Sequence, residues 1–344
     1  MARPLKSLFR SIRRIQGACA DTRGRADGSS LRSSLEERPL LVVIGSGNSG
    51  YPARYLEFLL LRIGCPVRLT TALEYTLHPP RQPHTCLLFS QGARRRDSLT
   101  IEAATRRLGV PLHLVCGEQA LAVDSVAARL VAEHGPHRVV ATSTAKDRSF
   151  VSLVGTAAAF VAAYELAATL GDDLPSAFPE VDWSTLTADA FPAPAEGARF
   201  VLHSPAGRAA AEAYAGYHNE SLGPVVALDM KDFTHGVWRG LRTGGRHTVY
   251  LVTGSRCRSL ADFLVEKLQD DHDCVIVEAS ADQWAVEPFE LHLRMLRYWA
   301  EACTLHHSTH QSWSPLRIDM DRWSAYRGIN GGFDLCTLRD GEDP

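Results

Sequence analysis

Short apolar runs that alternate with helical patterns constrain the fold of this chain most strongly. The first run, 40–44, ends directly in Gly-Ser-Gly, as expected for a buried parallel strand that enters a tight turn. Further strand-like runs lie at 66–70, 86–89, 112–115 and 139–141, and helical patterns lie at 55–63, 99–108, 119–133 and 150–170. This alternation predicts a doubly wound parallel sheet whose ligands bind at the carboxyl ends of the strands.

The second half of the chain repeats the same plan. Strand-like runs lie at 200–203, 225–228, 249–253 and 274–278, with helical patterns at 209–217 and 291–303. A stretch rich in Pro, Asp and Ala, 171–197, separates the two halves. The sequence therefore predicts an α/β protein with two tandem doubly wound, flavodoxin-like domains. We expect them at 39–172 and 195–303, after a basic helix and linker (1–38) and before a C-terminal tail (304–344).

Composition narrows the class of function. Apolar residues make up 45% of the chain, charged residues 22%, and the net charge is −2, so the totals do not indicate a nucleic-acid partner. No apolar run approaches the roughly 20 residues that a membrane-spanning helix needs. The eight cysteines are scattered without a CxxC pair, which favours reduced thiols and a cytoplasmic location.

The first 38 residues differ from the rest in charge, with nine Arg or Lys against four Asp or Glu. Their apolar residues share one face of a possible helix: Leu5, Leu8, Phe9, Ile12 and Ile15. We expect a helix that docks on the protein, followed by a Gly/Ser/Arg-rich linker at 21–34. A targeting presequence or a membrane-surface helix has a similar pattern and is the alternative.

The segment 45–50 matches GxGxxG, the dinucleotide-binding fingerprint. That fingerprint requires an acidic residue about 20 positions later, at the end of the second strand, to bind the ribose hydroxyls. The corresponding stretch here, 67–71, contains no acid, and the next one is Glu74. NAD binding is therefore disfavoured, while Arg68 keeps NADP as a formal alternative.

Four motifs in order along the first half resemble those of the sugar isomerase (SIS) domain family. The pattern Gly-x-Gly-x-Ser-x-x-x-Ala at 45–53 is similar to the first SIS motif, and 88–92 (Leu-Phe-Ser-Gln-Gly) is similar to the start of the family's phosphate loop. The segment 141–146 resembles the Ala-Ser-Thr-Lys motif with one residue inserted, and 74–75 is Glu followed by an aromatic residue, as in the family. The resemblance implies a bound sugar phosphate.

The resemblance implies phosphate contacts from hydroxyls and backbone N–H groups near helix N-termini, where an anion is favoured. The corresponding residues here are Ser46, Gly47, Ser49, Ser90, Gln91, Ser143, Thr144 and Lys146. Where the family has Ser-Gly-Glu-Thr, this chain has arginines, and we expect Arg94 and Arg95 to bind phosphate in place of the missing hydroxyl. The alternatives are ordinary turn and cap residues, and a solvated basic patch.

A second site is implied by residues 212–220 and 232–237, which resemble the catalytic helix and loop in the isomerase domain of glucosamine-6-phosphate synthase. The resemblance implies that Glu220 moves a proton between C1 and C2 and that His235 opens the sugar ring from a neighbouring subunit, so we expect a homodimer. Two departures weaken this isomerase role. The family's helix lysine is Tyr217 here, and no lysine follows residue 267.

The functional hypothesis is therefore a sugar-phosphate isomerase or deaminase without the glutamine-hydrolysing domain of the synthase. A catalytically silent SIS protein that senses or scaffolds around an anionic sugar is the alternative, and an NADP oxidoreductase is a third. We expect no cofactor. Cys303 and the nearby residues His306, His307 and His310 have a spacing that permits metal binding, but an irregular surface tail explains them better, so no metal is expected.

Overall fold

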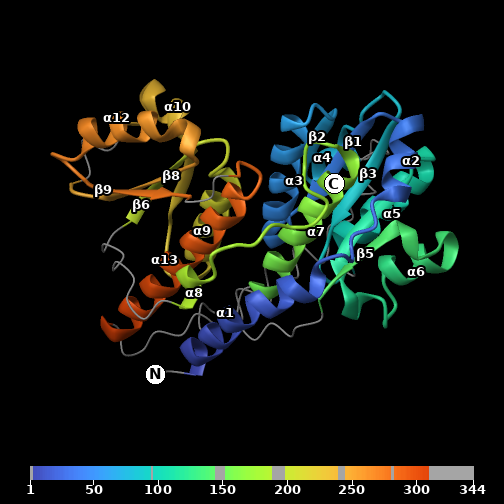
Figure 1. Cartoon of the computed structure of the whole chain (residues 1–344), viewed down its shortest axis with the longest axis horizontal. Coiled ribbons are helices and arrows are strands. Elements are labelled where there is room, and N and C mark those ends of the chain that lie inside the picture. Colours follow the sequence, from blue (N-terminus) through green and yellow to red (C-terminus); the bar gives the residue numbers. More distant parts are fainter. Residues whose placement is uncertain are drawn as a thin grey trace, which may run out of the picture. The chain divides into compact units, whose positions relative to one another are not determined.

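The structure is a computed structural model that describes residues 3–93, 96–143, 152–187, 198–238, 245–279 and 283–309. These residues form two compact units, each built on its own sheet (Figure 1). The first unit contains described residues in the ranges 14–143 and 152–178. The second contains described residues in the ranges 3–13 and 179–309.

The sheet of the first unit has five parallel strands in the order β2-β1-β3-β4-β5. The strands are β1 (Leu40–Gly45), β2 (Val67–Thr70), β3 (His84–Phe89), β4 (Leu112–Gly117) and β5 (Val139–Thr142). All five strands predicted from the sequence are present, and the order is that of the flavodoxin-like fold.

Helices cover both faces of this sheet (Figure 1). Alternate residues of each strand point to opposite faces, and one face packs its apolar side chains against the helices α4 (Ala72–Leu77), α5 (Arg96–Leu108) and α6 (Val126–His134). The other face is covered by α3 (Gly50–Arg62) and α7 (Val154–Leu170), which also pack on each other. The central strands β3 and β4 are buried along their whole length, which explains why most of their residues are apolar.

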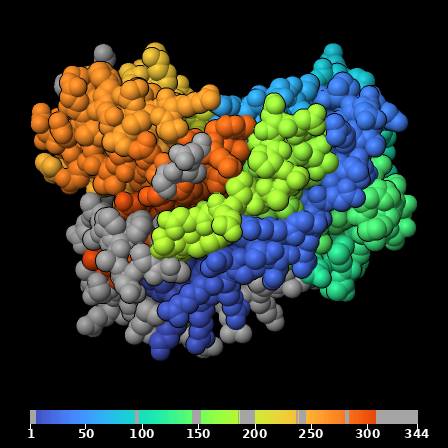
Figure 2. Space-filling view, viewed as in Figure 1, coloured from blue at the N-terminus to red at the C-terminus, as the bar shows by residue number. Residues whose placement is uncertain are grey.

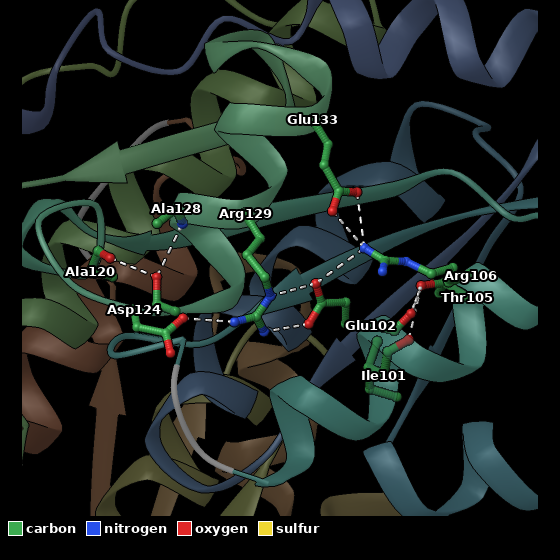
Figure 3. Close-up of polar contacts among 10 residues, drawn as sticks. Ile101, Glu102, Thr105, Arg106, Ala120, Asp124, Ala128, Arg129 and Glu133 are labelled. Carbon is green, nitrogen blue, oxygen red and sulfur yellow. Dashed lines mark hydrogen bonds and ion pairs between the residues drawn. The ribbon is translucent and has the colours of Figure 1, made fainter.

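An ion-pair network joins α5 to α6 (Figure 3). The Arg129 guanidinium donates to both carboxylate oxygens of Glu102, at 3.0 and 2.6 Å, and to Asp124 at 3.0 Å. Arg106 donates to both oxygens of Glu133, at 2.8 and 2.9 Å. The Arg129–Glu102 contact uses two guanidinium nitrogens, which fixes orientation as well as distance. The network therefore ties α5, the helix that follows the predicted phosphate loop, to α6.

The sequence prediction of one helix over 119–133 is wrong in its first half. A short turn, η2 (Glu118–Ala120), follows β4, and α6 begins only at Val126. Ser125 sets this start, because its hydroxyl accepts the N–H of Ala128 and donates to the carbonyl oxygen of Ala120.

The basic amphipathic segment forms the helix α1 (Arg3–Thr22), as predicted, and α1 appears as a dark-blue ridge in Figure 2. Its apolar residues Leu8, Ile12 and Ile15 are buried, so the amphipathic pattern serves docking. The predicted linker is partly wrong, because residues 29–37 form the helix α2 (Ser29–Glu37).

A buried glutamate fixes the chain between α1 and α2. The Glu165 carboxylate on α7 accepts the N–H of Gly24 at 2.7 Å and of Ala26 at 3.3 Å. Burial raises the pKa of Glu165, and these N–H groups oppose that shift. The contact spans 141 positions of sequence.

The second unit has four parallel strands in the order β7-β6-β8-β9. They are β6 (Ala198–His203), β7 (Val226–Asp229), β8 (Thr248–Thr253) and β9 (Asp273–Glu278). The helices α9 (Arg208–Ser221) and α13 (Glu287–Thr309) pack together on one face. The helices α10 (Met230–Asp232) and α12 (Arg258–Leu268) lie on the other. The helix α8 (Ser184–Thr187) lies in the predicted connection, and α13 continues through residues 304–309, where an irregular tail was expected.

None of the helices that the structure describes has the length and hydrophobicity needed to cross a bilayer. The seven cysteines in the described ranges are all unpaired, and Cys19, Cys86, Cys116 and Cys303 are buried. Burial raises the pKa of the Cys86, Cys116 and Cys303 thiols to about 12.

Candidate functional site

The candidate site lies at the carboxyl edge of the first sheet. β1 and β3 are neighbours in the sheet, but the chain leaves β1 toward β2 on one side, whereas β3 is followed by β4 on the other. Such a switch point opens a crevice between the two following loops, and ligands of doubly wound sheets bind there. The loops here contain Ser46, Gly47 and Ser49 after β1, and Ser90 and Gln91 after β3. The fold therefore brings these five predicted phosphate-binding residues to one edge.

The turn from β1 into α3 depends on two glycines. A Cβ on Gly45 would lie 2.6 Å from the carbonyl oxygen of Ser49 and 3.0 Å from the Cβ of Ala53. Gly47 has φ = +54°, a left-handed conformation that favours glycine. The turn closes with the Ser49 N–H donating to the carbonyl oxygen of Ser46 at 3.2 Å. The glycines of the GxGxxG match are therefore explained by the close approach of β1 to the start of α3 and by the left-handed turn between them. A bound dinucleotide is not needed to explain them.

The loop after β3 is held by its own hydroxyls and by a strained residue. The Ser90 Oγ lies 2.8 Å from the Oγ of Ser98, a buried residue in the first turns of α5. Ala93, with φ = +46°, is buried and accepts the N–H of Val126. Non-glycine residues in this conformation cost energy and concentrate at functional sites. Sequence reasoning missed Ser98, although a hydroxyl in the first turns of a helix after a phosphate loop was an available signal.

Gln91 is fixed on both sides. Its carbonyl oxygen accepts the N–H of Gly117 at 2.9 Å. A Cβ on Gly117 would lie 2.5 Å from the Gln91 Nε2, and a Cβ on Gly155, at the start of α7, would lie 2.6 Å from the Gln91 Cδ. Two glycines on different elements therefore make room for this side chain, so its amide occupies a defined place at the edge.

Ser143, a predicted phosphate-binding residue, has hydrogen-bond partners within the chain, and its phosphate contact stays a prediction. Ser143 follows β5 and is buried. Its N–H donates to the Oγ1 of Thr22 at 3.0 Å, and its Oγ donates to the carboxylate of Asp21 at 3.4 Å. Both donor groups of Ser143, its N–H and its hydroxyl, therefore bind residues at the end of α1. Arg94, Arg95, Thr144 and Lys146 lie outside the described residues, and their phosphate contacts stay predictions.

Glu74 has a local structural role. Its carboxylate accepts the N–H and the hydroxyl of Thr71 and the hydroxyl of Thr70, while the Thr71 hydroxyl accepts the Glu74 N–H, which forms a capping box at the start of α4. These hydrogen bonds, that of the Thr71 N–H first, lower the pKa of Glu74.

Glu220 and His235 lie at opposite ends of the strands of the second sheet, which are called here its amino edge and its carboxyl edge. The helix α9 connects two parallel strands and so runs antiparallel to them, which places its last turn, with Glu220, at the amino edge. His235 lies in a π-helical turn, η4 (Phe233–Val237), beyond the carboxyl end of β7. Both side chains are exposed, and β7 separates the edges by about 13 Å. One chain does not bring these residues together in this unit.

The lysine-to-tyrosine departure has a packing explanation. Tyr217 is 1% exposed, and its ring centroid lies 5.3 Å from that of Trp299 on α13. An ammonium group in this contact would be buried among aromatic rings at a high desolvation cost. Tyr217 is therefore part of the core between α9 and α13.

No protein-family model and no curated protein matches the amino-acid sequence. Solved structures do match the fold. A candidate phosphosugar isomerase from Silicibacter pomeroyi superposes with a TM-score of 0.66 at 15% identity, over 92% of this chain and 100% of that one. Glucosamine-6-phosphate deaminase from Thermotoga maritima superposes with a TM-score of 0.63 at 12% identity, over 91% of this chain and 96% of that one. The chain has the double-SIS fold.

The C-terminal domain of glucosamine-fructose-6-phosphate aminotransferase from Francisella tularensis supports the same conclusion. Its TM-score is 0.59 at 12% identity, over 86% of this chain and 95% of that domain. The predicted fold, two tandem parallel-sheet SIS domains, is thereby confirmed. At these identities the likeness establishes the double-SIS architecture, and the roles of individual residues remain predictions.

Proposed function

We propose that this double-SIS protein binds a phosphorylated sugar at the switch point of its first unit. The observation that carries the proposal is the meeting of the loops after β1 and β3, which places Ser46, Ser49, Ser90 and Gln91 at one sheet edge. Hydroxyls, an amide and the starts of two helices form a suitable environment for a phosphate group. The names of the similar structures, which include a glucosamine-6-phosphate deaminase, point to the same ligand class.

The proposed reaction is aldose–ketose isomerisation or deamination of the sugar phosphate. Glu220 acts as the base that moves a proton at C2, and His235 opens the ring. Because the two residues lie at opposite edges of their sheet, each site takes Glu220 from one chain and His235 from another. A homodimer in the cytoplasm is the corresponding assembly.

A catalytically silent protein that senses a sugar phosphate is the second candidate. Two observations favour it. Tyr217 occupies the position of the family's lysine and is committed to the core, and no lysine follows residue 267. A protein of this kind would bind the sugar phosphate at the same site but would not catalyse a reaction on it.

Thermal unfolding tests the ligand class. Sugar phosphates at about 100 times their Kd are expected to raise the Tm by roughly 5–10 °C, because a ligand that binds only the folded state stabilises it by mass action. The unphosphorylated sugars and NADP are the matched controls and should leave the Tm unchanged. A clear shift with NADP and none with any sugar phosphate would overturn the proposal.

The arginines of the phosphate loop provide a second test. Arg94→Ala or Arg95→Ala is expected to weaken sugar-phosphate binding by about 10- to 100-fold, the effect of losing one charge-assisted hydrogen bond. Arg107→Ala is the control, because Arg107 is an exposed arginine in the last turn of α5, the helix that follows the loop. Calorimetric titration measures the affinities. Unchanged affinity in both loop variants would show that these arginines form only a solvated patch.

A further inference from the structure

The second unit contains its own candidate anion loop. β6 and β8 are neighbours in the second sheet, while the chain leaves β6 toward β7 on the other side, so a second switch point lies between β6 and β8. The loop after β8 runs through Gly254 into the turn η5 (Ser255–Cys257) and then into α12, a helix of eleven residues. Its place corresponds to that of the Ser90–Gln91 loop in the first unit.

A carboxylate of the protein occupies this loop. The Glu287 Oε1 accepts the N–H of Ser255 at 3.0 Å and the hydroxyl of Ser255 at 2.6 Å. A Cβ on Gly254 would collide with the Glu287 Oε2. Glu287 is 4% exposed, although its partner Ser255 is exposed. Backbone and hydroxyl donors ahead of a helix therefore hold a buried anionic group.

The hydroxyl of Ser204 ties the two loops at this switch point together. Ser204 is buried after β6, and its Oγ accepts the N–H of Gly254 at 3.3 Å and of Gly207 at 3.4 Å. Arginines flank the loop as well: Arg256 is exposed next to Ser255, and Arg258 forms ion pairs with Asp262 and Glu278. The Ser204 hydroxyl therefore fixes the backbone of the loop, while Ser255 holds the Glu287 carboxylate.

The two units differ in the residues at the start of the helix that follows the last strand of the sheet. In the first unit the helix α7 follows the last strand and begins with Val154 and Gly155, next to Gln91. In the second unit the helix α13 follows the last strand and begins with Glu287, next to Ser255. The start of α7 thus leaves room for Gln91, whereas the start of α13 supplies a carboxylate that reaches the loop.

We propose that the loop after β8 is an anion-binding site whose built-in occupant is Glu287. The side chain takes the place of a small free anion, a carboxylate or a phosphate, and keeps such ligands out of the second unit. The proposal is independent of the function proposed for the first unit, because it concerns residues of the second unit alone.

Removal of the occupant should create a site for free anions. Glu287→Ala is expected to lower the Tm, and sodium acetate or inorganic phosphate at tens of millimolar is expected to raise the Tm of this variant by about 3–5 °C more than that of the wild type. Sodium chloride at equal ionic strength controls for screening. Glu290→Ala is the matched variant: Glu290 is also buried on α13, but its carboxylate pairs with Arg294, so acetate and phosphate should not rescue it.

A second variant keeps the proposal testable if Glu287→Ala does not fold. Glu287→Gln retains the shape and an acceptor oxygen but removes the charge. It is expected to melt several degrees below the wild type if the loop selects an anion. A Tm equal to that of the wild type would show that any acceptor suffices. That result, or equal anion rescue of the Glu287→Ala and Glu290→Ala variants, would overturn the proposal.

Discussion

Replacement of Glu220 by glutamine is expected to abolish proton exchange at C2 of a sugar phosphate. Wild-type protein incubated with glucose-, fructose- and glucosamine-phosphates in deuterated water should place deuterium on C2 of the aldose or C1 of the ketose. The amide of Glu220→Gln keeps the shape and removes the base, so the exchange rate should fall by about 100-fold or more while sugar-phosphate affinity stays unchanged. Nuclear magnetic resonance measures the label.

The matched control is Glu212→Gln, two turns earlier on α9, where the carboxylate pairs with Arg208 on the helix surface. It should exchange at the wild-type rate. Wild-type protein that binds a sugar phosphate but shows no exchange across the panel would favour the sensing alternative. Exchange that persists in Glu220→Gln would show that another group is the base.

The opposite-edge positions of Glu220 and His235 allow the shared site to be tested as part of the same experiment. Glu220→Gln and His235→Asn chains should each be impaired alone, the latter mainly on closed-ring sugars. After subunit mixing, half of the dimers are mixed and each of these carries one intact shared site, so about a quarter of the wild-type activity should return. No recovery in demonstrably mixed dimers would contradict a site shared between chains.

The largest stability effect is expected at Gly45. Gly45→Ala places a methyl group 2.6 Å from a backbone oxygen of Ser49 and 3.0 Å from the Ala53 Cβ, so the strand-to-helix turn must move. Overpacking of this kind costs about 1–3 kcal/mol, and the Tm should fall by roughly 3–10 °C. Because the displaced turn carries Ser46 and Ser49, sugar-phosphate binding should be lost as well. Calorimetry measures both quantities.

Gly17→Ala is the control for this substitution. Gly17 lies inside α1, and a Cβ there would meet no atom within 4 Å. The same chemical change should therefore stabilise the protein by about 0.5–1 kcal/mol through helix propensity. If Gly45→Ala leaves the Tm and the sugar-phosphate affinity at the wild-type values, the turn is more adaptable than the contacts of Gly45 indicate.

The strands and the loops at their carboxyl ends could be predicted from the sequence because they depend on residues that are close together in the chain. The nine strands of the described residues lie at the strand-like runs predicted from the sequence. Buried strands such as β1 and β8 are mostly apolar, because both faces of the sheet are covered. Parallel pairing then brings the ends of β1 and β3 together, so Ser46 and Ser90 could be placed at the same end of the sheet.

The contacts that could not be predicted depend on partners that are distant in sequence. The resemblance of the Ser143 motif to that of the SIS family gave no sign that Ser143 also donates to Asp21 and Thr22, more than 120 positions away. The carboxylate of Glu287 reaches Ser255 across 32 positions. No local pattern reveals either contact. Such pairings become visible only when the packing of helices against the loops is known.

The 141-position contact between Gly24 and Glu165 has a consequence for synthesis on the ribosome. Gly24 and Ala26 are made early, but their acceptor on α7 emerges only after some 140 further residues. At about 5–20 residues per second this interval lasts roughly 7–30 s. During that time the preceding helix, whose residues Ile15, Ala18 and Cys19 are buried in the finished protein, is not yet fixed by the contacts of Gly24 and Ala26 with Glu165. The nascent chain therefore presents a basic amphipathic segment to solvent and to chaperones before its first unit can close.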